Sequence, residues 1–226
     1  MALNRRDTLL AIAAVAAAMP MKAAWAADAD EANGIVDKAR VTFDNVIKTK
    51  EFVSLRAGLK SAKGVLIYPE ILKAGFFLGG SGGTGVLMVR GSGNDWSDPA
   101  FYTMGAVSFG LQFGGQAAEV VILINTQKGI DGLMTSAVKL GGDASVAAGP
   151  VGVGQAADVT VDFVSYSKAK GAFIGVNVEG SVLDVRDTLN NAYYGKKVTP
   201  IDIVSKRTVS NKHSAGLRAA VAAASK

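Results

Sequence analysis

Three close pairs of aspartates are the first candidates for chemistry in this chain, because two carboxyl groups about 5–10 Å apart act together as general acid and base. Two of the pairs occur where turns and helix starts use aspartate for local hydrogen bonds, which explains them without a reaction. The third pair lies in a strand-like segment, and its spacing leaves its role open. We therefore expect no enzyme activity. The pairs are Asp95 with Asp98, Asp184 with Asp187, and Asp158 with Asp162.

Nucleophilic and metal chemistry have few residues to work with. The chain has one histidine, His213, and no cysteine, so it offers no thiol nucleophile, no thiolate metal ligand and no disulfide. A Ser-His-Asp triad would have to use His213, yet the sequence contains no G-x-S-x-G turn. We expect His213 to lie at the surface, and we expect neither a metal nor another cofactor.

A glycine-rich run from Gly80 to Gly85 matches the G-x-G-x-x-G pattern of dinucleotide sites. That pattern binds a pyrophosphate where a helix begins directly after it. Here the strand-like residues 86–89 follow. We therefore interpret the run as the turn of a hairpin around residues 81–83.

Positive charge is concentrated in one part of the chain. The formal net charge is +5, and residues 38–73 hold eight lysines and arginines against three acidic residues. Gathered on one face, these groups would attract an anionic surface; distributed over several faces, they would form an ordinary solvated surface. Basic and aromatic residues do not alternate as they do in nucleic-acid-binding surfaces, so nucleic acid is not an expected partner.

The first 26 residues have the pattern of an export signal. Arg5 and Arg6 precede an apolar segment over 8–18 that is too short to span a bilayer, and Ala24-Trp25-Ala26 has the form of a cleavage site. The paired arginines resemble a twin-arginine signal, with general secretion as the alternative route. We expect one domain over 27–226, periplasmic or secreted and peripherally attached to the membrane; the alternative is that residues 1–26 stay attached as an anchor.

Apolar residues recur at helical spacing over 30–49, which predicts an amphipathic helix, and the pattern continues in a second helical piece over 52–59. From Gly64 the chain changes to short apolar runs that contain glycine, as bent antiparallel strands do. We predict an α+β fold: a curved or barrel-like, mainly antiparallel, glycine-rich sheet with N-terminal and C-terminal helices packed on it. Strands are expected over 64–68, 74–80, 84–90, 104–116, 119–125, 145–154, 158–167 and 171–183, and further helices over 130–138, 187–194 and 211–224.

Seven short strings occur in a fixed order along most of the chain. They are Ala62–Glu70, Lys73–Gly80, Gly83–Arg90, Trp96–Tyr102, Gly110–Gln116, Lys170–Gly180 and Asn191–Gly195. In that order they closely resemble the SYLF-domain family. The resemblance covers about residues 35–205, and the order of the strings makes it specific.

The resemblance implies binding rather than catalysis. Similar domains occur in eukaryotic endocytic and membrane-trafficking proteins, where they bind phosphoinositides and phosphatidic acid, and the yeast branch also binds actin. The family's lipid contact is attributed to an amphipathic N-terminal helix and to basic residues.

For an exported chain the resemblance implies an anionic phospholipid as ligand, with a phosphatidic acid or phosphoinositide-like headgroup, and actin is not expected. An envelope module that binds another protein is the alternative. The basic residues at the matching places are Lys38, Arg40, Lys48, Lys60, Lys63 and Lys73.

Overall fold

The computed structural model describes residues 5–75, 78–109, 116–149, 160–169 and 178–226. Its strands are β1 (Gly64–Gly75), β2 (Leu78–Val89), β3 (Ala100–Phe109), β4 (Gln116–Ile124), β5 (Val138–Lys139), β6 (Val146–Ala148), β7 (Phe163–Ala169) and β8 (Val182–Val185). Its helices are α1 (Arg5–Ile47), α2 (Val53–Leu59), α3 (Gln127–Thr135), α4 (Asp187–Tyr194) and α5 (Ala215–Ala224), with a π-helix η1 (Ile201–Ser205) and a 3-10 helix η2 (Lys212–Ser214).

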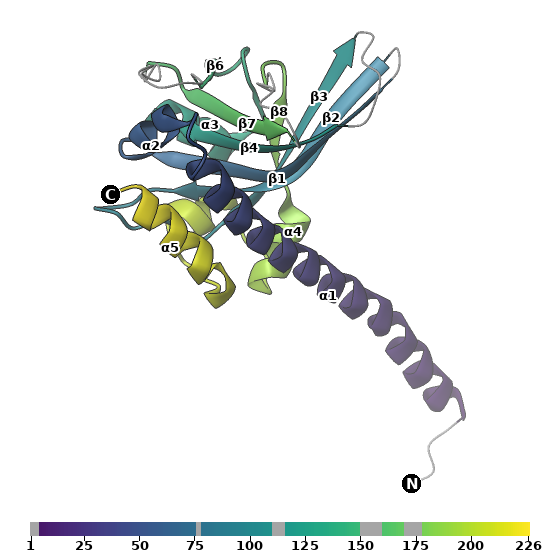
Figure 1. The fold of residues 1–226 in the computed structure, drawn as a ribbon. Coiled ribbons are helices and arrows are strands. Elements are labelled where there is room, and N and C mark those ends of the chain that lie inside the picture. Colours follow the sequence, from purple (N-terminus) through teal and green to yellow (C-terminus); the bar gives the residue numbers. More distant parts are fainter. Residues whose placement is uncertain (1–4, 76–77, 110–115, 150–159, 170–177) are drawn as a thin grey trace.

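Within the described residues, all the strands join one sheet in the order β5-β8-β3-β2-β1-β4-β7-β6. Every pairing is antiparallel except that of β6 with β7. The turn over 140–145 connects the two edge strands, and Leu140 and Ala144 form a bridge within it. The sheet therefore curls into a half-barrel (Figure 1), which confirms the predicted curved α+β fold.

Both faces of the central strands are buried, because successive side chains of a strand point to opposite faces. In β1, Val65 and Ile67 enter a core shared with α1, α2, α4 and α5. Leu66 and Tyr68 enter a second core, shared with α3 and η1. All four side chains are 0% exposed. Burial on both faces explains why the sequences of these strands are continuous apolar runs and do not alternate between apolar and polar residues.

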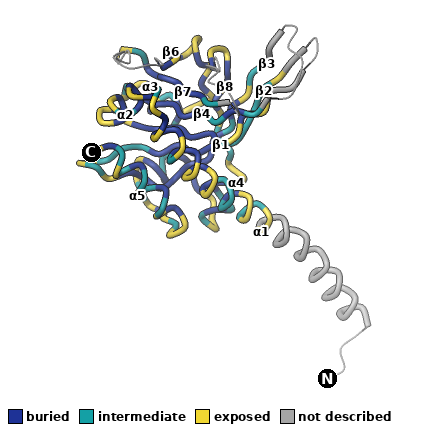
Figure 2. The backbone as a smooth tube through the Cα atoms, in the orientation of Figure 1, coloured by how far each residue is buried: buried dark blue, intermediate teal, exposed yellow. Residues whose placement is uncertain are grey.

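Helix α1 confirms the helix predicted over 30–49 and is longer than that range. It extends from Arg5 to Ile47, and its C-terminal part lies beside the sheet and α5 (Figure 1). Among the α1 residues whose side chains are described, Ala32, Val36, Phe43 and Val46 lie in the hydrophobic core, and Figure 2 shows buried residues along this part of the helix. Among the helices in the described ranges, none combines the length and apolarity that a membrane crossing requires.

Two expectations about the centre of the sheet were wrong. Pro69 does not end β1, because the strand continues past it as a bulge with register shifts against both neighbours. Gly83 and Gly85 lie inside β2 rather than in a hairpin turn. A Cβ on Gly83 would lie 2.1 Å from the carbonyl oxygen of Glu70, and one on Gly85 would lie 2.3 Å from that of Ile67. The glycine run thus leaves room for the bulge.

The C-terminal part follows the prediction closely. Helix α4 has the bounds expected, and Gly195 ends it with a φ of 65°, as glycine commonly does. The last helical segment is capped by Asn211, whose side chain accepts a hydrogen bond from the His213 backbone N–H at 3.0 Å. The strands expected over 145–154, 158–167 and 171–183 lie partly outside the described residues, and β6, β7 and β8 are their described parts.

We expect Gly85→Ala to lower the free energy of unfolding by about 2 kcal/mol, because the added methyl group meets the backbone carbonyl oxygen of Ile67 and the ring of Tyr68, which is fully buried. Urea denaturation followed by circular dichroism measures the change. Gly105→Ala is the matched control, since a Cβ at Gly105 in β3 meets nothing within 4 Å. Equal stability of the two variants would show that the bulge relaxes to accept a side chain.

Candidate functional site

The six basic residues selected from the sequence do not share one face. Lys38 and Arg40 both lie on α1, but two residues correspond to roughly 200° of rotation around a helix, so they point to opposite sides. Lys38 lines a groove beside the β1 bulge. Arg40 lies against α5, where a Cβ added to Gly216 would come within 3.1 Å of its guanidinium. Lys73 belongs to β1, opposite Ser81, and its side chain lies outside the described residues.

The other three candidates, Lys48, Lys60 and Lys63, surround α2, which lies at the C-terminal end of α1 (Figure 1). Lys48 directly follows α1, Lys60 is the C-terminal cap residue of α2, and Lys63 directly precedes β1. All three are exposed. Lys50, in the turn between the two helices, is exposed in the same region.

Two arginines hold α2 in place by donating hydrogen bonds to backbone carbonyls. Arg56 donates a hydrogen bond to the carbonyl oxygen of Ile47 at 2.9 Å, at the end of α1. Arg90 donates to the carbonyl oxygens of Leu59 and Ala62, the latter at 2.8 Å, at the end of α2. The last carbonyls of a helix have no partner within it. Burial lowers the pKa of Arg90, whose guanidinium is thus a structural group and not a free charge.

The outward side of α2 carries Val53, Ala57 and Lys60, which are spaced four and three residues apart and so share one helix face. Val53 is 36% exposed. Glu51 is the only acidic residue between Lys48 and Lys63, against five basic ones. Among the described residues, none of the four lysines has an ion-pair partner. We call this surface the α2 face; it comprises Lys48, Lys50, Val53, Ala57, Lys60 and Lys63.

The apolar side of α1 does not belong to any binding surface in this conformation. Val36, Phe43 and Val46 are 0–1% exposed and contact the sheet, α2, α4 and α5 within one core. The sequence suggested this side as the part of the helix that meets a lipid bilayer. Since the fold uses it as the interior, the structure does not support that role for residues 32–47.

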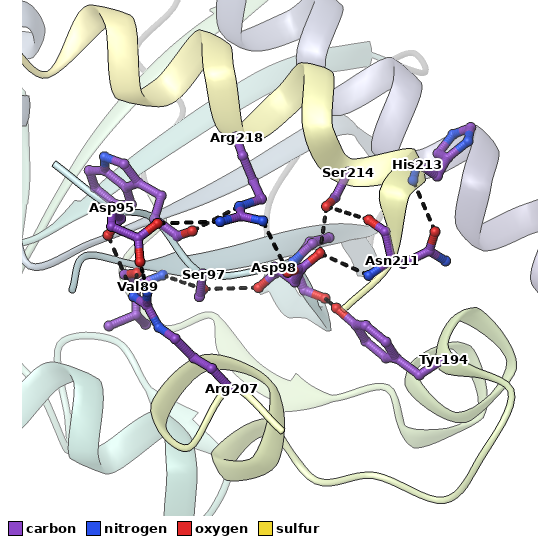
Figure 3. A network of polar contacts seen from close by, with 12 residues as sticks. Val89, Asp95, Ser97, Asp98, Tyr194, Arg207, Asn211, His213, Ser214 and Arg218 are labelled. Carbon is purple, nitrogen blue, oxygen red and sulfur yellow. Dashed lines mark hydrogen bonds and ion pairs between the residues drawn. The ribbon is translucent and has the colours of Figure 1, made fainter. Parts of the chain in front are cut away.

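The buried carboxylate of Asp98 organises a polar network between the β2–β3 loop and the C-terminal segment (Figure 3). It accepts hydrogen bonds from the Asn211 backbone N–H at 3.1 Å and from the Ser214 hydroxyl at 2.5 Å. Arg218 lies 3.4 Å from Asp98 and 3.3 Å from Asp95. Arg207 forms an ion pair with the same Asp95. These contacts hold α5 on the body. The pair thus has a structural role, but through segments distant in the chain and not through the local turn hydrogen bonds that we expected.

A second buried carboxylate, Asp162, joins three segments that precede α3, β6 and β7. It accepts hydrogen bonds from the Thr126 hydroxyl at 2.5 Å and from the Ser145 backbone N–H and hydroxyl at 3.0 and 2.9 Å. Lys128 lies 3.8 Å away. Burial raises the pKa of Asp162, but these hydrogen bonds and the Lys128 charge outweigh it, so the pKa is lowered overall. Asp162 is thus a structural anion.

The remaining candidates for chemistry lie apart. Asp184 and Asp187 are exposed, the second in the first turn of α4, and Asp158 lies outside the described residues. His213 is at the surface as expected, with its Nε2 3.1 Å from Asp37 of α1. Among the described residues, no group of three or more potential ligands is close enough to hold a metal ion.

The sequence comparisons place these features in a family. A family model described as "Ysc84: Las17-binding protein actin regulator" matches residues 105–224, which is more than half of the chain. The chain belongs to the Ysc84 family. This assignment confirms the resemblance to SYLF domains that the ordered strings indicated.

Ysc84-family relatives with curated descriptions are longer than this chain. "LAS seventeen-binding protein 3" of Saccharomyces cerevisiae is 36% identical over 156 residues, which are 66% of this chain and 34% of the relative. "SH3 domain-containing YSC84-like protein 1" of Homo sapiens is 29% identical over 151 residues, 65% of this chain and 44% of the relative. The chain thus spans about a third to under a half of these relatives. No solved structure matches the chain significantly.

Acid should weaken the Asp162 junction. Because the folded-state pKa is lowered, the carboxylate contributes stability above its unfolded pKa, about 4, and that contribution is lost as the pH falls through the folded value. We expect wild-type protein to lose about 1–3 kcal/mol more than Asp162→Asn between pH 6 and pH 2.5, measured by urea denaturation. Asp184→Asn, at an exposed site, is the control; identical acid profiles for all three proteins would contradict the assignment.

Proposed function

We propose that this Ysc84-family domain is a non-enzymatic, membrane-associated module that binds anionic phospholipid through the α2 face. The observation that carries the proposal is the group of four exposed lysines without ion-pair partners around α2, within the part of the chain that the structure describes. The arginines nearby are engaged with backbone carbonyls, so the mobile positive charge of this end is that of the lysines.

The expected attachment is weak and reversible. A lysine near an anionic membrane contributes about 1 kcal/mol, so the α2 face supplies roughly 4 kcal/mol, and salt screens this attraction over about 10 Å. Val53 and Ala57, at the centre of the lysines, are small enough to enter only the headgroup region.

The magnitudes also explain why α1 is not proposed as the inserted helix. Undocking it would expose Val36, Phe43, Val46 and Ile47, all buried, at about 1.5–3 kcal/mol for each side chain. That cost exceeds what four lysines return at an anionic surface. In the proposal α1 supports the binding surface from the inside, and α2 meets the lipid.

We also propose that residues 1–26 are an export signal and that the domain acts outside the cytoplasm. Cleavage after Ala26 would keep the α1 side chains described in the hydrophobic core, which run from Ala32 to Ile47. The ion pair of Glu31 with Arg186, 3.0 Å, would also be kept. The folded body described here is therefore compatible with removal of the leader.

A protein-binding role is the second candidate, because the curated yeast relatives are described as binding LAS seventeen. Those relatives are about three times as long as the matched region, so the description belongs to the whole proteins. On this alternative the α2 face would bind an acidic protein surface instead of a bilayer. Vesicle binding decides between the two.

Reversing two charges of the α2 face, Lys60→Glu with Lys63→Glu, should weaken binding to vesicles that contain phosphatidic acid by at least about tenfold. Co-sedimentation of the protein, as isolated from the cells that make it, measures the affinity. Wild-type binding should fall as salt rises and should be lost on vesicles of phosphatidylcholine alone.

The matched control is Lys196→Glu with Lys197→Glu, which changes the net charge equally at two exposed lysines just beyond α4. These lie away from α2 (Figure 1). Equal losses in the two double variants would attribute binding to net charge and contradict the α2 face. Binding that ignores lipid charge would sink the lipid proposal altogether.

Expression of the full chain in a bacterial host should yield a periplasmic protein that starts at Ala27, as read by N-terminal sequencing. Replacing Arg5 and Arg6 by lysines should abolish export if the twin-arginine route is used and leave it unchanged if general secretion is used, because only the first route requires the arginine pair. A cytoplasmic protein with an intact N-terminus would refute the export proposal.

A further inference from the structure

A groove follows α1 across the middle of the sheet. It consists of two adjoining hollows of about 600 and 360 Å³ that share Lys38, Pro69 and Glu70 in their linings. We call these two hollows together the α1 groove. It extends beside α1 from Glu31 to Thr42, which is roughly 16 Å of helix.

The α1 groove exposes apolar side chains. Val41, in the larger hollow, is 53% exposed, and Leu72, in the smaller one, is 56% exposed. They are the two most exposed large apolar side chains among the described residues. Apolar side chains that gather in a hollow and are rimmed by charges are typical of an interaction surface.

Charges of both signs surround these apolar residues. The groove-lining charges are the carboxylates of Glu31, Asp37, Glu70 and Glu119 and the ammonium groups of Lys38 and Lys168. Two of the carboxylates already have cationic partners in the fold, Arg186 for Glu31 and His213 for Asp37.

Glu119 accepts a hydrogen bond from Thr42 at 3.1 Å. Among the described residues, Glu70, Lys38 and Lys168 have no ion-pair partner. The groove therefore holds unpaired groups of both signs.

This mixture indicates which occupant fits. An anionic bilayer or a nucleic acid offers no positive group to pair with Glu70 and Glu119, so it would not complement the groove. A suitable partner brings an apolar centre together with one positive and one negative group. A second copy of the same groove brings all three, and a two-fold axis pairs each group with its complement twice.

We propose that the α1 groove is a self-association surface, in which two copies meet about a two-fold axis along α1. Lys38 of each copy faces Glu70 of the other, and Val41 and Leu72 form the apolar centre. Gly34 lies on the same side of the helix, four residues before Lys38, and a Cβ there would meet nothing within 4 Å, so a neighbouring helix has room to approach.

The contact is weak. Stable dimers bury about 1,200–2,000 Å² in total, and a groove of this length alone is at the low end of that range. We expect a dissociation constant in the micromolar range or above, so the domain is monomeric when dilute and dimeric when concentrated, for example on a surface. The inference does not depend on lipid binding, because the groove and the α2 face share no residue.

Analytical ultracentrifugation of the protein as isolated from cells tests the proposal. As the protein concentration rises, the average mass of the wild-type protein should increase from that of one copy to that of two. The Val41→Glu variant should stay monomeric. We expect it to fold normally, because the Val41 side chain is mostly exposed. Lys38→Glu and Glu70→Lys should each raise the dissociation constant of the dimer about tenfold, since each creates two like-charge contacts across the two-fold axis.

In the double variant Lys38→Glu with Glu70→Lys, the dissociation constant of the dimer should return to within about threefold of the wild-type value, because the two charges are exchanged and the pairs are kept. Val53→Glu, on the α2 face, is the control and should not affect dimerisation although it weakens vesicle binding. A wild-type protein that stays monomeric up to about 1 mM, or a double variant no better than the single ones, would overturn the proposal.

Discussion

The burial of one side of α1 is the constraint on which the rest of the structure depends. Val36, Phe43 and Val46 close the core between the sheet and the helices α2, α4 and α5, and burial of such side chains stabilises a fold by about 1.5–3 kcal/mol each. A helix held in this way has no apolar side left for a membrane. Its outer side and the short helix after it are the surfaces on which the two proposed binding roles depend.

Charged residues divide into two groups by what they contact. Asp98, Asp162, Arg56 and Arg90 are engaged with backbone groups and hydroxyls and hold segments distant in sequence together. Buried charges persist in proteins when they are paired in this way. Exposed lysines around α2 and the mixed charges of the α1 groove are among the groups still available to a ligand. The first group explains the fold, and the second supports the two proposals.

Much of the architecture could be predicted from the sequence, because the patterns that indicate it are local. Helical spacing gave α1 and α2, glycine after α4 gave its end, and glycine-rich apolar runs gave a bent sheet. The candidate site was readable only in part. Lys48, Lys60 and Lys63 were selected from composition and resemblance, and Lys50 was missed although it lies in the same basic run. Lys38 and Arg40 were grouped with them on charge alone, although a spacing of two residues on the predicted helix already turns them about 200° apart.

By itself the sequence determined the family, the α+β class and the positions of most helices and strands, because these depend on neighbouring residues and on ordered motifs. Only the tertiary structure decided that Pro69 forms a bulge over Gly83 and Gly85, that the apolar side of α1 is interior, and that Asp98 and Asp162 are structural. Each of those outcomes depends on what a residue meets across the sheet, far away in the chain. Such contacts are set by packing in space, which spacing along the chain does not encode.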